Sequence, residues 1–160
     1  DILGREHHMA TATSKEIDAL ERVQDALPPG YVPSDDENYM HTQQQNNFRK
    51  LLIEWKRSIR SAADKTLQSL QDGPLREPDL NDRASSETDW GIELRTRDRQ
   101  RKLVAKIDAA LRRIDEGEYG YCEVTGDPIG LRRLIARPVA TMTVEAQEAH
   151  ERREKVSRED

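Results

Sequence analysis

Two carboxylates three residues apart, Asp79 and Asp82, are the first candidates for chemistry in this sequence. They could accept charge-assisted hydrogen bonds from the basic groups of a partner or perturb a nearby metal ion. A simpler interpretation is that Asp82 caps a following helix. Segment 72–89 holds six acidic and two basic residues, whereas segment 90–113 holds eight basic and three acidic residues. This separation of charge is unlike a solvated helical surface with interspersed signs, and it favours a functional acidic segment.

The single cysteine, Cys122, excludes an internal disulfide and fits a reducing cytoplasm. Two interpretations of Cys122 are open: a small apolar side chain or a redox-sensing thiol. The sequence contains no Cys–His dyad, phosphate-binding loop or metal-binding cluster, which argues against a stand-alone enzyme.

The composition favours an elongated molecule over a large packed core. Of 160 residues, 36% are charged and 34% hydrophobic, with one Phe, two Trp and four Tyr. The net charge of −5 indicates no general attraction to nucleic acid. No apolar run approaches the ~20 residues that a bilayer span needs. We therefore expect a cytoplasmic protein that neither spans a membrane nor binds DNA directly.

Two long helices are predicted, over 42–71 and 84–115. The first begins at a capping-box pattern, Thr42 with Gln45, and ends before Asp72-Gly73-Pro74. Each helix has one narrow apolar stripe, formed by Leu51, Trp55, Ile59, Ala62, Thr66 and Leu70 in the first and by Ile92, Leu103, Ile107, Leu111 and Ile114 in the second. Burying the two stripes against each other predicts an antiparallel coiled-coil hairpin.

The fold class expected is mainly α, divided into five parts. We interpret residues 1–8, which precede Met9 and contain two histidines, as the remnant of an expression tag. Residues 9–41 form an N-terminal helix (14–27) and an irregular linker, and residues 42–115 form the hairpin with its tip at 72–84. Residues 116–142 form a small turn-rich head, and 143–160 a C-terminal helix.

Four blocks in this order resemble the DksA/TraR family of transcription regulators, from about Tyr39 to the C-terminus. They are Asp79-x-x-Asp82-Arg83-Ala84, the arginine-rich arm, Gly120-Tyr121-Cys122-Glu123, and Ile129-Gly130-x-Arg132-Arg133-Leu134. No single block would be specific, but their combination is.

The resemblance implies a monomer that binds bacterial RNA polymerase and inserts its coiled-coil tip into the secondary channel. With guanosine tetraphosphate, (p)ppGpp, such proteins repress ribosomal RNA promoters and activate some biosynthetic promoters in the stringent response. The tip residues of the family fall on Asp79, Asp82 and Ala84. Polymerase or nucleotide contacts are implied for Arg95, Arg99, Lys106 and Arg137, whereas a further family lysine is replaced by Gln147. The alternative for any one of these basic residues is a solvated surface position.

The family's head is usually a four-cysteine zinc site, and here the sequence departs from the pattern. The four ligand positions are occupied by Cys122, Thr125, Thr143 and Ala146. Structural zinc needs four donors, mostly thiolate or imidazole. We therefore expect no zinc and no tightly bound cofactor. The head should instead be held by apolar packing, with Tyr121, Val124, Ile129, Leu131, Leu134, Ile135, Val139 and Met142 as the candidates.

Two other function classes remain to be weighed. A secondary-channel elongation or transcript-cleavage factor would use the same acidic-tipped hairpin to assist phosphoryl chemistry at the polymerase active site. A small DNA-binding protein with a zinc-finger-like head is disfavoured by the missing ligands and the net charge of −5.

Overall fold

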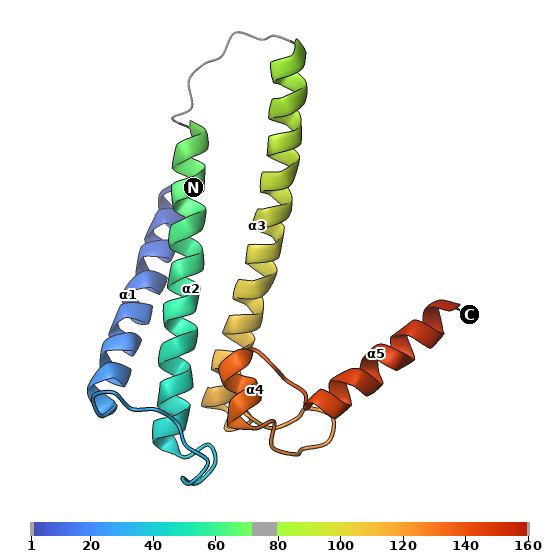
Figure 1. Ribbon diagram of the computed structural model, residues 1–160. Coiled ribbons are helices and arrows are strands. Elements are labelled where there is room, and N and C mark those ends of the chain that lie inside the picture. The colour runs from blue at the N-terminus through green and yellow to red at the C-terminus, as the bar shows by residue number, and fades with distance from the viewer. Residues whose placement is uncertain (1, 72–79, 160) are drawn as a thin grey trace.

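The computed structural model describes the backbone of residues 2–71 and 80–159, and the side chains of residues 14–68 and 88–159. Five helices follow in order: α1 (Ile2–Ala26), α2 (Thr42–Gln71), α3 (Leu80–Asp115), α4 (Leu131–Ala136) and α5 (Val144–Glu159). In Figure 1, α2 and α3 form the two arms of a hairpin, α1 lies beside α2, and the head with α4 lies at the base of α3. The mainly helical hairpin expected from the sequence is confirmed.

The predicted bounds of α2 are confirmed, but its N-terminus is capped by other residues than expected. His41 precedes the helix, and its ring Nδ1 accepts a hydrogen bond from the backbone N–H of Gln43 at 3.3 Å. The side chain of Gln44 accepts one from the backbone N–H of Met40 at 2.8 Å. The side chains that cap α2 are therefore His41 and Gln44, each one residue earlier than the predicted pair, and they do not bond each other reciprocally as in a capping box.

The helix α1 joins the hairpin through a buried lysine that the sequence pattern did not single out. Lys56 of α2 is 8% exposed. Its Nζ lies 2.6 Å from Oε1 of Glu16 in α1 and 2.7 Å from Oδ1 of Asp108 in α3. Leu20 and Val23 of α1 are buried as well. One cation therefore links three helices, beside a small apolar contact.

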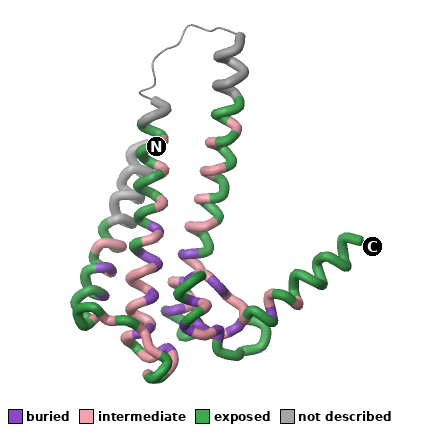
Figure 2. Tube along the Cα trace, in the orientation of Figure 1, coloured by how far each residue is buried: buried purple, intermediate pink, exposed green. Residues whose placement is uncertain are grey.

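The cluster of buried hydrophobic residues that forms the core lies at the base of the hairpin and in the head (Figure 2). It joins α2, α3 and the head, and its fully buried large apolar side chains are Phe48, Leu52, Ile107 and Leu134. Towards the tip, the expected apolar seam is absent among the described side chains, and its predicted member Leu70 lies outside them. Ile92 is 50% exposed and Leu94 59%, while polar residues such as Glu93 and Gln100 are partly buried. The prediction that Ile92 belongs to the seam is wrong.

The head contains one short helix, α4, that the turn-rich sequence did not predict. Among the described residues its only strand-like pairing is an isolated bridge between Tyr121 and Pro128. Leu131 and Leu134 are buried as expected, but Val124 is 59% and Ile135 51% exposed, so these two do not belong to the core. Tyr119 was missed: it is buried, and its hydroxyl donates to the carbonyl of Pro138 at 2.7 Å.

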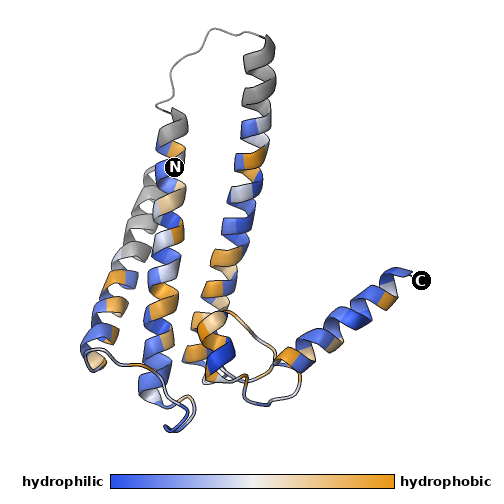
Figure 3. Ribbon diagram, in the orientation of Figure 1, coloured by the Kyte–Doolittle hydropathy of each residue, from blue (hydrophilic) through white to orange (hydrophobic). Residues whose placement is uncertain are grey.

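The helix α5 projects away from the head and is hydrophilic over most of its surface (Figure 3). Among its residues only Ala146, near its start, is buried. No helix that the structure describes is long and apolar enough to cross a bilayer.

Candidate functional site

The helix ends that flank the predicted acidic tip, the end of α2 at Gln71 and the start of α3 at Leu80, lie at the far end of the hairpin from the head (Figure 1). Asp79 falls outside the described residues, and Asp82 and Ala84 are described by their backbone alone. Because α3 begins at Leu80, Asp82 lies within the first helical turn and does not occupy the capping position considered above.

The basic residues of the α3 arm divide into paired and unpaired groups. Arg97 pairs with Glu93 at 3.4 Å, and Lys102 pairs with Asp98 at 3.0 Å. The hydrogen bond and the charge of Lys102 lower the pKa of Asp98. In contrast, several described basic residues, Arg112 among them, form no ion pair with another described residue. They include the four that the family resemblance assigns to contacts, Arg95, Arg99 and Lys106 of α3 and Arg137 of the head, and these four are exposed.

Arg95 and Arg99 line one open hollow of about 520 Å³ along α3, together with Ile92 and Asp98. The Nε of Arg95 donates to the carbonyl of Gly91 at 3.3 Å, one turn earlier. The guanidinium of Arg99 has no such partner among the described residues. An exposed cationic hollow of this kind can accept an acidic side chain or a phosphate.

The four positions that correspond to zinc ligands are brought together in the head. The thiol of Cys122 accepts hydrogen bonds from the side chain of Thr125 and from the backbone of Thr143. The Thr143 hydroxyl in turn accepts one from the backbone N–H of Ala146 at 3.2 Å. Hydrogen bonds around the single sulfur atom of Cys122 therefore hold together the two segments that contain these four positions.

This donor set does not fit structural zinc. It offers one thiol, two hydroxyls and a methyl group, whereas zinc needs four thiolate, imidazole or carboxylate donors. Among the described residues there is no group of three or more His, Cys, Asp or Glu side chains that could hold a metal ion. Burial opposes ionisation of the Cys122 thiol, but the hydrogen bonds from Thr125, Thr143 and Val124 outweigh it and lower the pKa from 9.0 to about 7.

Tyr39, in the linker before α2, fastens the head to the hairpin. Its hydroxyl donates to the carbonyl of Gly120 at 2.6 Å and accepts from the backbone N–H of Gly130 at 3.0 Å. Its ring meets Tyr121 edge-on, with 5.6 Å between ring centroids. Gly120 has a φ of +91°, and a Cβ there would lie 2.8 Å from Cγ of Met40. Only glycine fits this close approach.

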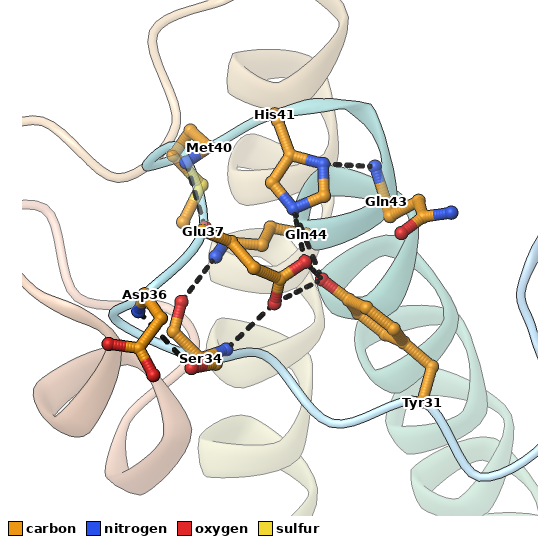
Figure 4. Close-up of polar contacts among 8 residues, drawn as sticks. All are labelled: Tyr31, Ser34, Asp36, Glu37, Met40, His41, Gln43 and Gln44. Carbon is orange, nitrogen blue, oxygen red and sulfur yellow. Dashed lines mark hydrogen bonds and ion pairs between the residues drawn. The ribbon is translucent and has the colours of Figure 1, made fainter.

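The same linker is folded by a second polar cluster, drawn in Figure 4. Oε2 of Glu37 lies 2.7 Å from Nε2 of His41 and accepts a hydrogen bond from the Tyr31 hydroxyl at 2.9 Å. Burial works against the charged carboxylate, but the hydrogen bonds from Tyr31, Ser34 and His41 lower the pKa of Glu37. Burial and the bond to Glu37 raise the pKa of Tyr31 to about 12. The cluster holds the linker so that Tyr39 reaches the head.

Together these features define a class of protein: an elongated helical hairpin that carries its acidic end away from a compact head with finger-like loops. Comparison with protein families gives two matches. Residues 44–114 match the N-terminal domain of the DnaK suppressor protein DksA, and residues 117–152 match the prokaryotic dksA/traR C4-type zinc finger.

Individual relatives agree with these matches. The chain is 58% identical over 130 residues to the RNA polymerase-binding transcription factor DksA of Caulobacter vibrioides (strain NA1000 / CB15N), covering 81% of this chain and 92% of the relative. It is 40% identical over 125 residues to the protein of that name from Escherichia coli (strain K12), covering 78% and 83%.

A solved structure, that of transcription factor DksA2 from Pseudomonas aeruginosa, superposes with a TM-score of 0.68 at 37% identity. It covers 85% of this chain and 98% of that one. The chain therefore belongs to the DksA family, as the sequence motifs indicated. Within that family it carries a degenerate finger.

Proposed function

We propose that this chain binds bacterial RNA polymerase directly and regulates transcription. The support is the family itself: relatives 58% and 40% identical, matched over most of their length, are named RNA polymerase-binding transcription factors. The same membership argues for a regulator and against an enzyme.

We further propose that the hairpin enters the secondary channel of the polymerase with its tip foremost. The observation that carries this proposal is the placement of the core at the base of a long arm. The 36 residues of α3 extend about 54 Å at 1.5 Å per residue. Such an arm can carry the carboxylates of Asp79 and Asp82, with Ala84 beside them, to a depth that a globular domain cannot reach. There they would accept hydrogen bonds from basic or polar polymerase groups.

The four unpaired basic residues are proposed to contact polymerase and the effector (p)ppGpp at the interface. Arg95 and Arg99 are assigned to acidic polymerase surface, and Lys106 and Arg137 to the nucleotide phosphates. Their lack of described ion-pair partners supports this, because no intramolecular pair need be broken when they bind. With the nucleotide, the protein would repress ribosomal RNA promoters and activate some biosynthetic promoters in the stringent response.

The proposal includes a cytoplasmic monomer that needs neither zinc nor another tightly bound cofactor and does not bind DNA directly. The donor set around Cys122 supports the absence of zinc. Metal analysis of protein purified without chelators tests this point. A zinc content near one ion per chain would contradict it.

The tip is tested by transcription from a ribosomal RNA promoter with purified polymerase, comparing wild type with Asp82→Asn. We expect inhibition by wild type, deepened by (p)ppGpp, and its loss in Asp82→Asn. The matched control is Asp89→Asn, which makes the same isosteric change at an exposed position two turns along α3. If Asp82→Asn inhibits as well as wild type at equal stability, the tip mechanism is wrong.

The nucleotide contacts are tested in the same assay with Arg137→Ala, which should weaken the response to (p)ppGpp while leaving nucleotide-free inhibition in place. Arg132→Ala, an exposed arginine on the neighbouring α4, is the control. Because Gln147 replaces a family lysine, Gln147→Lys should strengthen the response. Equal responses in wild type and Gln147→Lys would show that this position does not tune the nucleotide site.

An acidic-tipped hairpin also suits a second function, that of an elongation or transcript-cleavage factor acting through the same channel. A cleavage assay on stalled elongation complexes distinguishes the two. Cleavage that depends on Asp82, without promoter inhibition, would replace the regulator proposed here with a cleavage factor.

A further inference from the structure

Beyond the core, α2 and α3 border an open groove that no described segment fills. We call it the distal groove. It measures about 300 Å³ and is lined by Ile59, Arg60, Ala63, Asp64, Leu67, Arg97, Gln100, Arg101 and Val104. Leu67 lines this groove and is 37% exposed, so the groove leaves a large apolar side chain in contact with water. The arms of the hairpin stand apart at this level (Figure 1).

The groove continues along α3 towards the tip as a stripe of apolar and basic side chains. Its members are Trp90, Leu94, Arg97, Arg101 and Val104, at steps of four, three, four and three residues, which places them on one face of the helix. Trp90 is 48% exposed. Large apolar side chains are thus left in water next to arginines, as in surfaces that bind another chain.

The charge of the groove is positive. Three arginines line it, against the single carboxylate of Asp64. The side chain of Arg101 is 81% exposed and reaches Asp98 only at 4.0 Å, so this solvated pair can be exchanged for a carboxylate of a partner at small cost. The side chain of Arg97 is 33% exposed and lies 3.4 Å from Glu93, which leaves part of its guanidinium open to a second carboxylate.

Towards the base of the hairpin, the surface of α2 next to the groove is already covered by a helix, and that helix shows what kind of element the surface binds. There α1 packs on α2 with a carboxylate and two apolar side chains. Glu16 accepts hydrogen bonds from Arg60 at 2.8 and 2.9 Å and pairs with Lys56, while Leu20 and Val23 are buried. Arg60 belongs both to this contact and to the distal groove. An acidic amphipathic helix is therefore already seated on one end of the same surface.

We infer that the distal groove binds an acidic amphipathic helix of a partner protein. Leucine-like side chains of that helix would fill the hollow between Ile59, Leu67 and Val104, and its carboxylates would pair with Arg97 and Arg101. This inference is independent of the proposed function, because it depends only on the groove and on the way α1 packs.

Trp90 provides a direct reporter, because Trp55 is the only other tryptophan. The full-length Trp55→Phe protein is titrated with a synthetic helical peptide of about 18 residues, long enough for five turns. The peptide carries leucines on one face and glutamates beside them. A second peptide has lysine in place of every glutamate. We expect a saturable blue shift of Trp90 emission with the acidic peptide, weakened by salt, and none with the lysine peptide.

Charge reversal of the groove separates this inference from non-specific binding. In the double variant Arg97→Glu, Arg101→Glu, affinity for the acidic peptide should fall roughly tenfold or more, and the lysine peptide should now bind. Lys102→Glu makes the same kind of change on another face of α3 and should leave the affinity unchanged. Circular dichroism checks that each variant is folded.

Three results would overturn the inference. They are the absence of a saturable shift with the acidic peptide, equal affinity for the two peptides, and a fall in affinity in Lys102→Glu as large as in the double arginine variant. Sedimentation of the peptide-free protein tests a further occupant, a second copy of this chain. Self-association that the Arg97→Glu, Arg101→Glu variant abolishes would assign the groove to a dimer interface in place of a partner helix.

Discussion

Lys56 links three helices, and its removal gives the sharpest test of how the fold is held together. In Lys56→Met the aliphatic part of the side chain is kept and the ammonium group is lost. Glu16 then keeps only Arg60 as a cationic partner, and Asp108 keeps none among the described residues. The side chain of Glu16 is 16% exposed and remains poorly solvated, whereas that of Asp108 is 36% exposed and can be reached by water.

The size of the effect follows from these contacts. Removing one member of a fully buried ion pair costs about 3–5 kcal/mol, because the other charge stays buried without a partner. Here Arg60 compensates for part of the loss at Glu16, and water reaches Asp108. We therefore expect the free energy of unfolding to fall by about 2 kcal/mol in Lys56→Met.

Urea denaturation of wild type and variant measures this difference, and hydrogen exchange locates it. Exchange should rise most in residues 14–26 of α1, because their attachment depends on Glu16 and on the small apolar contact of Leu20 and Val23. Lys65→Met is the control: it makes the same substitution on α2 at an exposed lysine without a described ion pair, and it should change stability by less than about 0.5 kcal/mol.

One outcome would refute this reasoning. If Lys56→Met matched Lys65→Met in stability, and α1 exchanged as in wild type, the three-helix charge network would contribute nothing to the docking of α1.

Three further outcomes are expected in the head and are measured by urea denaturation. Leu134→Ala, at a fully buried core position, should cost about 3 kcal/mol. Tyr39→Phe should cost about 1–2 kcal/mol because Gly120 and Gly130 lose their hydroxyl partner; a loss below about 0.3 kcal/mol would contradict the role of Tyr39. Folding lowers the pKa of Cys122 from 9.0 to about 7, so the thiolate adds stability that is complete above pH 9 and is lost as the pH falls through 7. Cys122→Ser should remove this rise between pH 7 and 9, and an unchanged pH dependence would argue against the low pKa.

The arms of the hairpin could be predicted near its base, because there the spacing of apolar residues matches the faces that are buried in the structure. Apolar residues at steps of three and four mark α2, and Asp72-Gly73-Pro74 follows it. Towards the tip the two disagree. Ile92 continues the apolar pattern of α3 in its spacing, but it is 50% exposed and lines an open hollow with Arg95 and Arg99, and no described element covers it. Periodicity shows that a face is apolar, but it does not show whether another element reaches that face.

The contacts that fasten α1 and the head were hidden from sequence reasoning for a different reason. From the sequence, Lys56 is expected at the surface, because its partners Glu16 and Asp108 belong to helices distant in sequence. The structural role of Tyr39 could not be predicted either, because its hydrogen-bond partners lie in the head. The four finger positions were assigned from the family pattern, and their correspondence to zinc ligands stays a prediction. The roles of the tip and of the unpaired basic residues stay predictions.

The two hydrogen bonds of Tyr39 have a consequence for the order of events during synthesis. They join residues 81 and 91 positions apart, so Tyr39 cannot form them until most of the chain has left the ribosome. A metal could stabilise finger loops using residues close together in sequence, but in this chain the loops around Cys122 depend on a residue made before either arm. A nascent chain that ends within α3 would therefore contain residues of both arms but lack the head residues that complete the core. The core is completed only when the last third of the sequence has been made.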